Sequence, residues 1–141
     1  MSPVAVEKSP SLKVLVVDDE ALIRWSLAES LTDAGHTVIE AGDGASALVQ
    51  VSDGTRFDAI LLDYRLPDSN DLRLLQTIRE RQPDAAVVMM TAFGTPEVTA
   101  GALQLGAYEV VPKPFDVHDM VDLVARAHRA ARGTDEEGTH G

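Results

Sequence analysis

The segment Ala59-Ile-Leu-Leu-Asp63-Tyr-Arg-Leu-Pro67 runs four apolar residues straight into an aspartate, and a proline closes it four residues later. A continuous apolar run of this length is typical of a β-strand that is covered on both faces, as in a parallel sheet. Because aspartate also favours turns and strand ends, this carboxylate alone proves little. The same pattern, a short apolar run that ends in a polar residue, recurs along the chain and indicates the fold.

Apolar runs of this kind alternate with segments of helical periodicity. Strands are predicted at Leu12–Val17, Thr37–Ile39, Phe57–Leu62, Ala86–Met90 and Glu109–Val111. Helices are predicted over Glu20–Ala34, Ala45–Val51, Asn70–Arg81, Thr95–Gly106 and onward from Asp116. A chain of repeated βα units predicts an α/β fold, in which right-handed crossovers place helices on both faces of a parallel sheet.

Local signals support these boundaries. Gly35 follows the first helical segment as a stop. Asp43 and Asp116 precede the second and the last helix as caps. Pro96 stands in the first turn of its helix, where its missing N–H costs nothing.

Composition fits one ordinary domain. The 141 residues are 45% hydrophobic, which is enough for a core. We predict a flexible leader over residues 1–11, an ordered domain over residues 12–132 and a flexible acidic tail over residues 133–141.

The charge and residue types exclude several functions. A formal charge of −11 without a basic cluster disfavours direct binding of nucleic acid. The chain has no cysteine, so disulfide and thiolate chemistry are excluded. We see neither a signal peptide nor an apolar stretch that would span a membrane, and a cytoplasmic location is the expectation.

The polar residues that end the strands carry the functional hypothesis. Asp18 and Asp19 follow the first strand, Asp63 the third, Thr91 the fourth and Lys113 the fifth. In a parallel sheet all of these strand ends meet at one edge, where ligands of α/β proteins bind.

This set of side chains suits phosphoryl transfer. Carboxylates that share one crevice repel each other, so without a cation at least one would have a raised pKa. Oxygen ligands favour Mg²⁺ over zinc, and Asp18 and Asp19 are the better metal holders. Lys113 supplies a positive charge for a phosphate oxygen, Thr91 supplies a hydroxyl donor, and Asp63 is the best nucleophile for an aspartyl phosphate.

Four motifs together resemble the receiver domain of two-component response regulators. These motifs are Val16-Val17-Asp18-Asp19-Glu20, Leu61-Leu62-Asp63-Tyr-Arg-Leu-Pro67, Met90-Thr91-Ala92 and Val111-Pro112-Lys113-Pro114-Phe115. The resemblance covers roughly residues 12 to 130. It implies the flavodoxin-like fold of the chemotaxis receiver, with five parallel strands in the order 2-1-3-4-5.

The resemblance also implies a function. A sensor histidine kinase or phosphotransfer protein would pass a phosphoryl group to Asp63, as in two-component signalling and phosphorelays. Mg²⁺ would be held by Asp19, Asp63 and the backbone carbonyl of Arg65, with Asp18 assisting through water. Lys113 would contact the phosphate, and Thr91 would move toward it. The Lys113–Pro114 peptide bond would be cis.

Finer features resemble receivers of the nitrogen-regulation type, which precede a sigma-54-activating ATPase. The features are Ile23-Arg24-Trp25, Met89-Met90-Thr91-Ala92 and Gly106-Ala107-Tyr108-Glu109. The chain has no Gly-x-x-x-x-Gly-Lys-Ser/Thr motif, so it contains no such ATPase. A stand-alone receiver and the front of a longer regulator with a C-terminal output domain both stay open. The resemblance further implies a homodimer through the fifth strand and the two helices that flank it.

Three departures from the family pattern affect the switch. Val110 occupies the place of a switch aromatic, and Ser69-Asn70-Asp71 replaces the usual Met-Asp-Gly. Arg65 and Phe93, at positions that tune hydrolysis in this family, are both large, so we expect them to hinder water and prolong the phosphorylated state.

Other functions fit less well. A degenerate receiver that acts as a phosphate-independent interaction module is the serious alternative. A haloacid-dehalogenase-like phosphatase would need a second acid at Arg65, so we expect a phosphoacceptor switch rather than an enzyme. A nicotinamide or flavin protein would need a glycine-rich first turn, which here reads Asp18-Asp19-Glu20.

Overall fold

Five βα units build the protein. The computed structural model describes residues 10–140, with side chains described up to residue 133. The strands are β1 (Lys13–Val17), β2 (Thr37–Ala41), β3 (Ala59–Asp63), β4 (Ala86–Thr91) and β5 (Ala107–Pro112). The helices are α2 (Ala21–Asp33), α3 (Gly44–Ser52), α4 (Arg73–Arg81), α5 (Pro96–Gln104) and α6 (Val117–His140).

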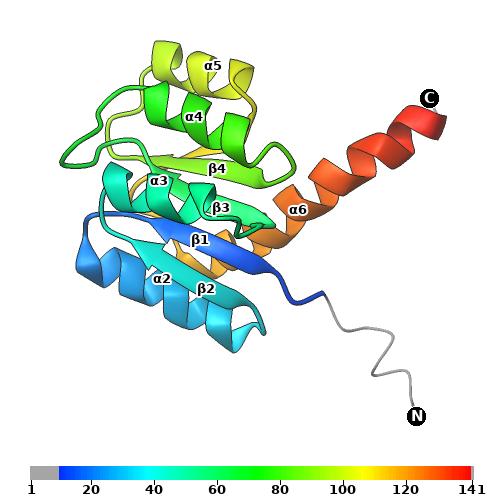
Figure 1. Cartoon of the computed structure of the whole chain (residues 1–141), viewed down its shortest axis with the longest axis horizontal. Helices are drawn as coiled ribbons and strands as arrows, with labels where there is room; N and C mark the ends of the chain where they lie inside the picture. The colour runs from blue at the N-terminus through cyan, green and yellow to red at the C-terminus, as the bar shows by residue number, and fades with distance from the viewer. Residues whose placement is uncertain (1–9, 141) are drawn as a thin grey trace.

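The strands form one parallel sheet in the order β2-β1-β3-β4-β5, as predicted (Figure 1). β1, β3 and β4 occupy the centre and are almost wholly buried, which explains their continuous apolar sequences. β2 and β5 form the two edges and are more exposed. The central strands therefore bring their ends to the middle of the molecule.

Alternate residues of each strand build two cores, one on each face of the sheet. Leu15, Val17, Ile60 and Leu62 point to the face that α3, α4 and α5 cover. Val14, Val16 and Leu61 point to the opposite face, which α2 and α6 cover. Helix positions that are spaced by three or four residues complete these cores, including Leu74, Leu75 and Ile78 in α4 and Met120, Leu123, Val124 and Ala127 in α6.

Capping signals in the sequence have the expected structural roles. Gly35 adopts a φ of 98° after α2, a conformation that glycine reaches without steric strain. The Asp43 side chain accepts a hydrogen bond from the Ser46 N–H, and the Thr95 side chain accepts one from the Val98 N–H. Asp116 Oδ1 accepts a hydrogen bond from the His118 N–H at 2.8 Å, ahead of α6. These contacts begin and end the helices close to the predicted residues.

The domain limits predicted at residues 12 and 132 stay predictions. The leader predicted over residues 1–11 lies outside the described residues except for its last two. The predicted boundary at residue 132 is not a helix end, because α6 continues through Gly133 to His140 (Figure 1). A glycine costs a helix interior only about 1 kcal/mol relative to alanine, so it does not end an established helix. The backbone of the expected flexible tail is thus helical up to His140.

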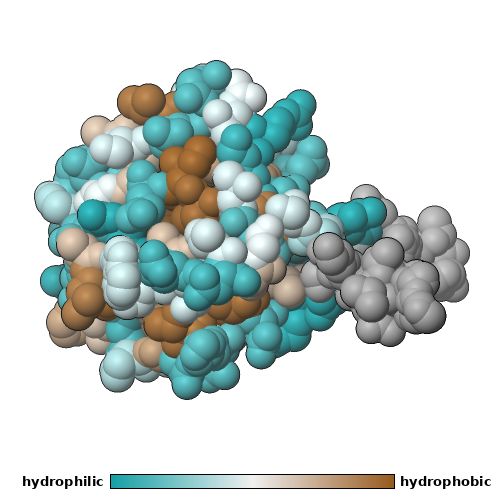
Figure 2. All heavy atoms as spheres, turned by 90° about the horizontal axis from the view of Figure 1, so that it is seen from below, coloured by the Kyte–Doolittle hydropathy of each residue, from teal (hydrophilic) through white to brown (hydrophobic). Residues whose placement is uncertain are grey.

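Within residues 10–140, no helix is both long and apolar enough to cross a membrane. Figure 2 views the molecule from the side on which α2 lies in Figure 1, and brown apolar patches there alternate with teal polar side chains. Leu22 and Trp25 of α2 are among the exposed large apolar residues.

Candidate functional site

The register of the sheet explains why distant acids meet. Val17 pairs with Leu62, so Asp18 and Asp63 leave neighbouring strands at the same level. Asp63 pairs with Met90, and Thr91 pairs with Pro112, which precedes Lys113. The carboxyl ends of four strands therefore deliver the predicted site residues to one edge.

Lys113 lies among three carboxylates. Its Nζ donates hydrogen bonds to Asp18 Oδ2 at 2.8 Å, to Asp63 Oδ2 at 3.1 Å and to Glu20 Oε1 at 3.1 Å. Asp18 is fully buried, and Asp63 and the Lys113 side chain are nearly so. The Lys113–Pro114 peptide bond is cis, as the sequence resemblance implied.

Electrostatics show that the cluster lacks positive charge. Burial and repulsion from Asp18 raise the pKa of Asp63 to about 6, even though Lys113 acts in the opposite direction. Burial by itself would lower the pKa of Lys113, but the hydrogen bond to Asp18 and the charge of Asp63 outweigh it and raise that pKa well above its ordinary value. One ammonium group therefore does not compensate for the acids around it.

The acids are close enough to hold a cation. Carboxylate oxygens of Asp18, Asp19 and Asp63 lie within 4.8 Å of one another. Three hard oxygen donors with an excess of negative charge fit Mg²⁺, which keeps several waters when it binds few protein ligands. Asp19 is exposed, so it stands at the open side of the cluster. A role for the Arg65 backbone carbonyl as a further ligand stays a prediction.

The loop after β1 is held by residues to which the sequence assigned no role. Arg24 Nη1 donates to the backbone carbonyl of Asp18 at 2.7 Å, and its Nε donates to Glu40 Oε1 at 3.1 Å. Asp18 Oδ1 accepts a hydrogen bond from the Glu20 N–H at 2.9 Å. Arg24 and the Glu20 contact with Lys113 were missed because both depend on tertiary placement, although Arg24 belongs to the quoted Ile23-Arg24-Trp25 motif.

Thr91 and Phe93 lie at the end of β4 and contact each other. Thr91 is buried, and its hydroxyl oxygen accepts a hydrogen bond from the Phe93 N–H at 3.0 Å. The guanidinium of Arg65 lies over the Phe93 ring, 4.8 Å from the ring centroid. The two large residues that the sequence singled out thus contact each other.

Val110, where the sequence resemblance implied a switch aromatic, lies on the edge strand β5. Val110 is half-buried in β5 and packs against the core on the α3–α5 side. Tyr108, two residues earlier, is 40% exposed. The aromatic ring therefore faces solvent, and an aliphatic side chain stands at the position from which a family aromatic would switch.

Comparisons with known proteins agree with this geometry. The family model for the response regulator receiver domain matches residues 14–125. The chain belongs to the response regulator receiver family. Its order of strands is the one expected of the receiver fold.

Relatives place this receiver near the nitrogen-regulation type. It is 40% identical over 114 residues to the DNA-binding transcriptional regulator NtrC of Escherichia coli (strain K12). The matched region covers 81% of this chain and 24% of NtrC. It is 35% identical over 127 residues to the response regulator protein FleR of Pseudomonas aeruginosa, which covers 89% of the chain and 27% of FleR. The chain thus spans about a quarter of the length of these curated relatives.

Solved structures give the same result. The crystal structure of NtrX from Brucella abortus superposes with a TM-score of 0.81 at 33% identity, covering 92% of this chain and 30% of NtrX. A CheY-like receiver domain protein from Methanospirillum hungatei JF-1 gives a TM-score of 0.80 at 24% identity, covering 94% of this chain and all of its own. The latter supports the fold alone.

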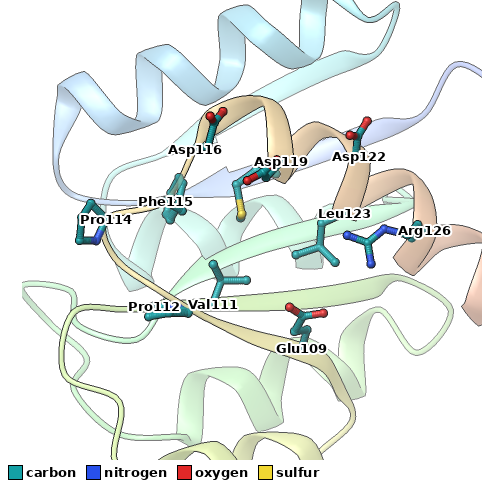
Figure 3. Close-up of a pocket in the computed structure, with 11 residues that line it drawn as sticks. Glu109, Val111, Pro112, Pro114, Phe115, Asp116, Asp119, Asp122, Leu123 and Arg126 are labelled. Carbon is teal, nitrogen blue, oxygen red and sulfur yellow. The ribbon is translucent and has the colours of Figure 1, made fainter.

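A hollow lies beside β5, lined by residues other than those of the acid cluster. It has a volume of about 510 Å³ between β5 and the start of α6. Figure 3 shows acidic side chains from both elements around it, with Arg126 at one end. Its acidic residues are Glu109, Asp116, Asp119 and Asp122. This hollow belongs to the α5–β5–α6 face, for which the sequence resemblance implied a homodimer.

Proposed function

We propose that this receiver is a phosphorylation-controlled switch that accepts a phosphoryl group on Asp63. The observation that carries the proposal is a buried carboxylate with a pKa raised to about 6, 3.1 Å from a lysine ammonium and beside two further acids. Binding of a ligand that brings positive charge and covers the site would relieve the free-energy cost of keeping such a carboxylate ionised. Family membership supports the same assignment.

The chemistry is a transfer between two nucleophiles. An oxygen of the Asp63 carboxylate attacks the phosphorus of a phosphohistidine on a sensor kinase or phosphotransfer protein. The new O–P bond forms as the P–N bond breaks, and the electron pair returns to the imidazole nitrogen, which takes up a proton. Attack of water on phosphorus later releases inorganic phosphate and restores the carboxylate.

The surrounding residues take roles that fit their positions. Asp18, Asp19 and Asp63, together with the Arg65 carbonyl, would hold Mg²⁺, which when bound neutralises charge on the phosphoryl oxygens. Lys113 already contacts Asp63 and would contact a phosphoryl oxygen with the same ammonium. Thr91, whose hydroxyl oxygen accepts from the Phe93 N–H, would donate its own O–H to a phosphoryl oxygen.

The same proposal covers partners and output. The longer relatives imply an output domain in a longer parent chain, which for a relative named as a DNA-binding regulator would be transcription. The receiver itself acts as a switch with at most weak self-phosphorylation and autodephosphorylation, in the cytoplasm where sensor kinases phosphorylate their targets. Homodimerisation through the α5–β5–α6 face would transmit the signal.

Incubation with Mg²⁺ and a small phosphodonor such as acetyl phosphate tests the proposal. Intact-protein mass spectrometry should show a gain of one phosphate, which disappears in Asp63→Asn and when Mg²⁺ is chelated. Asp122→Asn, an exposed acid on α6, serves as the matched control and should keep the gain. A wild-type protein that never gains phosphate would favour the phosphate-independent interaction module instead.

A further inference from the structure

The loop between β3 and α4 is tied to a distant helix by one side chain. Asp68 lies in this loop, five residues after Asp63. Its Oδ1 accepts a hydrogen bond from the Gly44 N–H at 2.7 Å, and its Oδ2 accepts one from the Ala45 N–H at 3.0 Å. Both donors belong to the first turn of α3. A single carboxylate therefore joins the loop that follows the phosphoacceptor to the start of a helix that precedes it in sequence.

Two aspartates accept hydrogen bonds from the free backbone N–H groups in the first turn of α3. Asp43 Oδ1 accepts from the Ser46 N–H at 2.7 Å, so it caps the helix from its own chain segment. Asp68, in the β3–α4 loop, accepts hydrogen bonds from the two preceding N–H groups, those of Gly44 and Ala45. The positive end of the helix dipole favours both carboxylates. The local cap alone would begin the helix, so the Asp68 contact has a role beyond capping.

The close approach depends on a glycine. A Cβ placed on Gly44 would lie 3.0 Å from Asp68 Oδ1 and 3.4 Å from its carboxyl carbon. Such a contact is tighter than nearly all real Cβ contacts. A larger residue at position 44 would therefore shift the carboxylate by a few tenths of an ångström, so the glycine eases the close approach of the loop.

The Asp68 contact constrains a short loop segment whose backbone is hydrogen-bonded at both ends. Leu66 and Ser69 exchange two backbone hydrogen bonds, Leu66 N–H to Ser69 O at 2.7 Å and Ser69 N–H to Leu66 O at 3.2 Å. At the other end, the Tyr64 N–H donates to the Met90 carbonyl at 2.8 Å. Between these fixed points stands Arg65. Docking of Asp68 thus limits where the Arg65 backbone can lie.

We propose that Asp68 is a positioning residue for the metal site, and that it holds the Arg65 carbonyl in place by anchoring the β3–α4 loop to the start of α3. This role rests on the proposed function, because Arg65 matters only if the acid cluster binds Mg²⁺. It also gives a physical account of how this loop is ordered without the glycine of the usual Met-Asp-Gly. Asp68 itself contacts neither the acids nor the phosphoryl group.

Three variants separate anchoring from helix capping. Asp68→Ala removes both hydrogen bonds to α3, whereas Asp68→Asn keeps one acceptor oxygen and should retain part of the function. Asp43→Ala is the matched control, since it removes one acidic cap from the same helix without touching the loop. All three variants remove one negative charge, so any difference among them does not come from net charge.

Two readouts are needed. Calorimetric titration with MgCl₂ should give a dissociation constant about tenfold higher for Asp68→Ala, since loss of residues that support metal ligands weakens metal binding by about 10- to 100-fold. The same constant should change less than about twofold for Asp43→Ala, which shares no partner with the loop. Amide hydrogen exchange of Leu66 and Ser69 should accelerate by about tenfold in Asp68→Ala alone.

The outcomes distinguish the two levels of the proposal. If wild-type protein neither binds Mg²⁺ nor gains phosphate, the proposed function is wrong and the role of Asp68 falls with it. If wild-type protein does both, but Asp68→Ala matches Asp43→Ala in Mg²⁺ affinity and in exchange at Leu66 and Ser69, only the anchoring role is overturned.

Discussion

Replacement of Asp63 by asparagine should stabilise the protein in the absence of Mg²⁺. Asparagine has the shape of the carboxylate, retains an oxygen that accepts from Lys113 and carries no charge. Burial and Asp18 raise the pKa of Asp63 to about 6 from an ordinary value of 3.8. Each pKa unit corresponds to about 1.4 kcal/mol, so the ionised group costs at most about 3 kcal/mol. Because the site opens to water at its mouth, we expect about 1 to 2 kcal/mol.

The stabilising effect of Asp63→Asn depends on pH. Between about pH 4 and pH 6 the folded protein binds more protons at Asp63 than the unfolded chain does. Its contribution to stability therefore falls as pH rises through this window and stays low above it. The difference in unfolding free energy between Asp63→Asn and wild type should be near zero below about pH 4 and reach its plateau above about pH 7.

Thermal denaturation followed by circular dichroism measures this difference. At pH 7.5 without Mg²⁺, a gain of about 1 to 2 kcal/mol corresponds to a rise in Tm of about 4 to 8 °C for a domain of this size. Mg²⁺ should raise the Tm of wild type more than that of Asp63→Asn, because binding to the folded state stabilises it. Asp122→Asn on the exposed side of α6 should change neither value. A lower Tm for Asp63→Asn than for wild type in metal-free buffer at pH 7.5 would refute the reasoning.

Three further predictions follow from other contacts. Phe93→Ala should shorten the lifetime of the aspartyl phosphate about two- to fivefold, because the Arg65 stack, about 0.5 to 1 kcal/mol at an exposed site, then no longer hinders water. An unchanged rate of phosphate loss, with Val49→Ala on the exposed side of α3 as control, would contradict this. Burial lowers the pKa of His36, whose Nδ1 accepts a backbone N–H at 3.0 Å, so the unfolded chain binds more protons below about pH 6.5. The free energy of unfolding attributable to His36 should fall as pH drops below that value, and difference curves from urea titrations should show that His36→Asn removes this slope. Beryllofluoride with Mg²⁺ should convert the protein to a dimer in sizing with light scattering; identical monomer masses with and without it would count against the α5–β5–α6 interface.

The fold was predictable because its signals are local. Buried central strands need continuous apolar runs, so β1, β3 and β4 were placed within two residues of their observed ends. The edge strands were predicted too short, since exposed positions such as Glu40 and Tyr108 weaken the apolar signal. α4 begins at Arg73 rather than Asn70, because the Asp71 side chain accepts the Arg73 N–H and holds the chain in a turn before the helix.

The site residues were also predictable, because their signals too are local in the sequence. Each predicted residue stands directly at a strand end, so sheet topology alone brings Asp18, Asp63 and Lys113 together. Contacts that join separate segments have no comparable pattern in the sequence. Arg24 reaches the Asp18 carbonyl from a helix, and Asp68 reaches α3 across 24 residues of sequence. No periodicity encodes these distances, and only the packed structure reveals them.

The aspartates of this receiver have opposite effects on stability, which depend on what their carboxylates face. Asp43 and Asp68 face backbone N–H groups at the start of a helix, and the hydrogen bond from Ser46 lowers the pKa of Asp43. Ionised Asp43 therefore stabilises the fold, and both carboxylates accept hydrogen bonds from the free N–H groups of the helix start. Asp63 faces Asp18 in a buried site, and its ionisation destabilises the fold. An Asp→Asn change should therefore destabilise the protein at the helix start and stabilise it in the cluster. The repulsion kept in the cluster is what a cation and a phosphoryl group would relieve, so this local instability supplies part of the free energy for their binding.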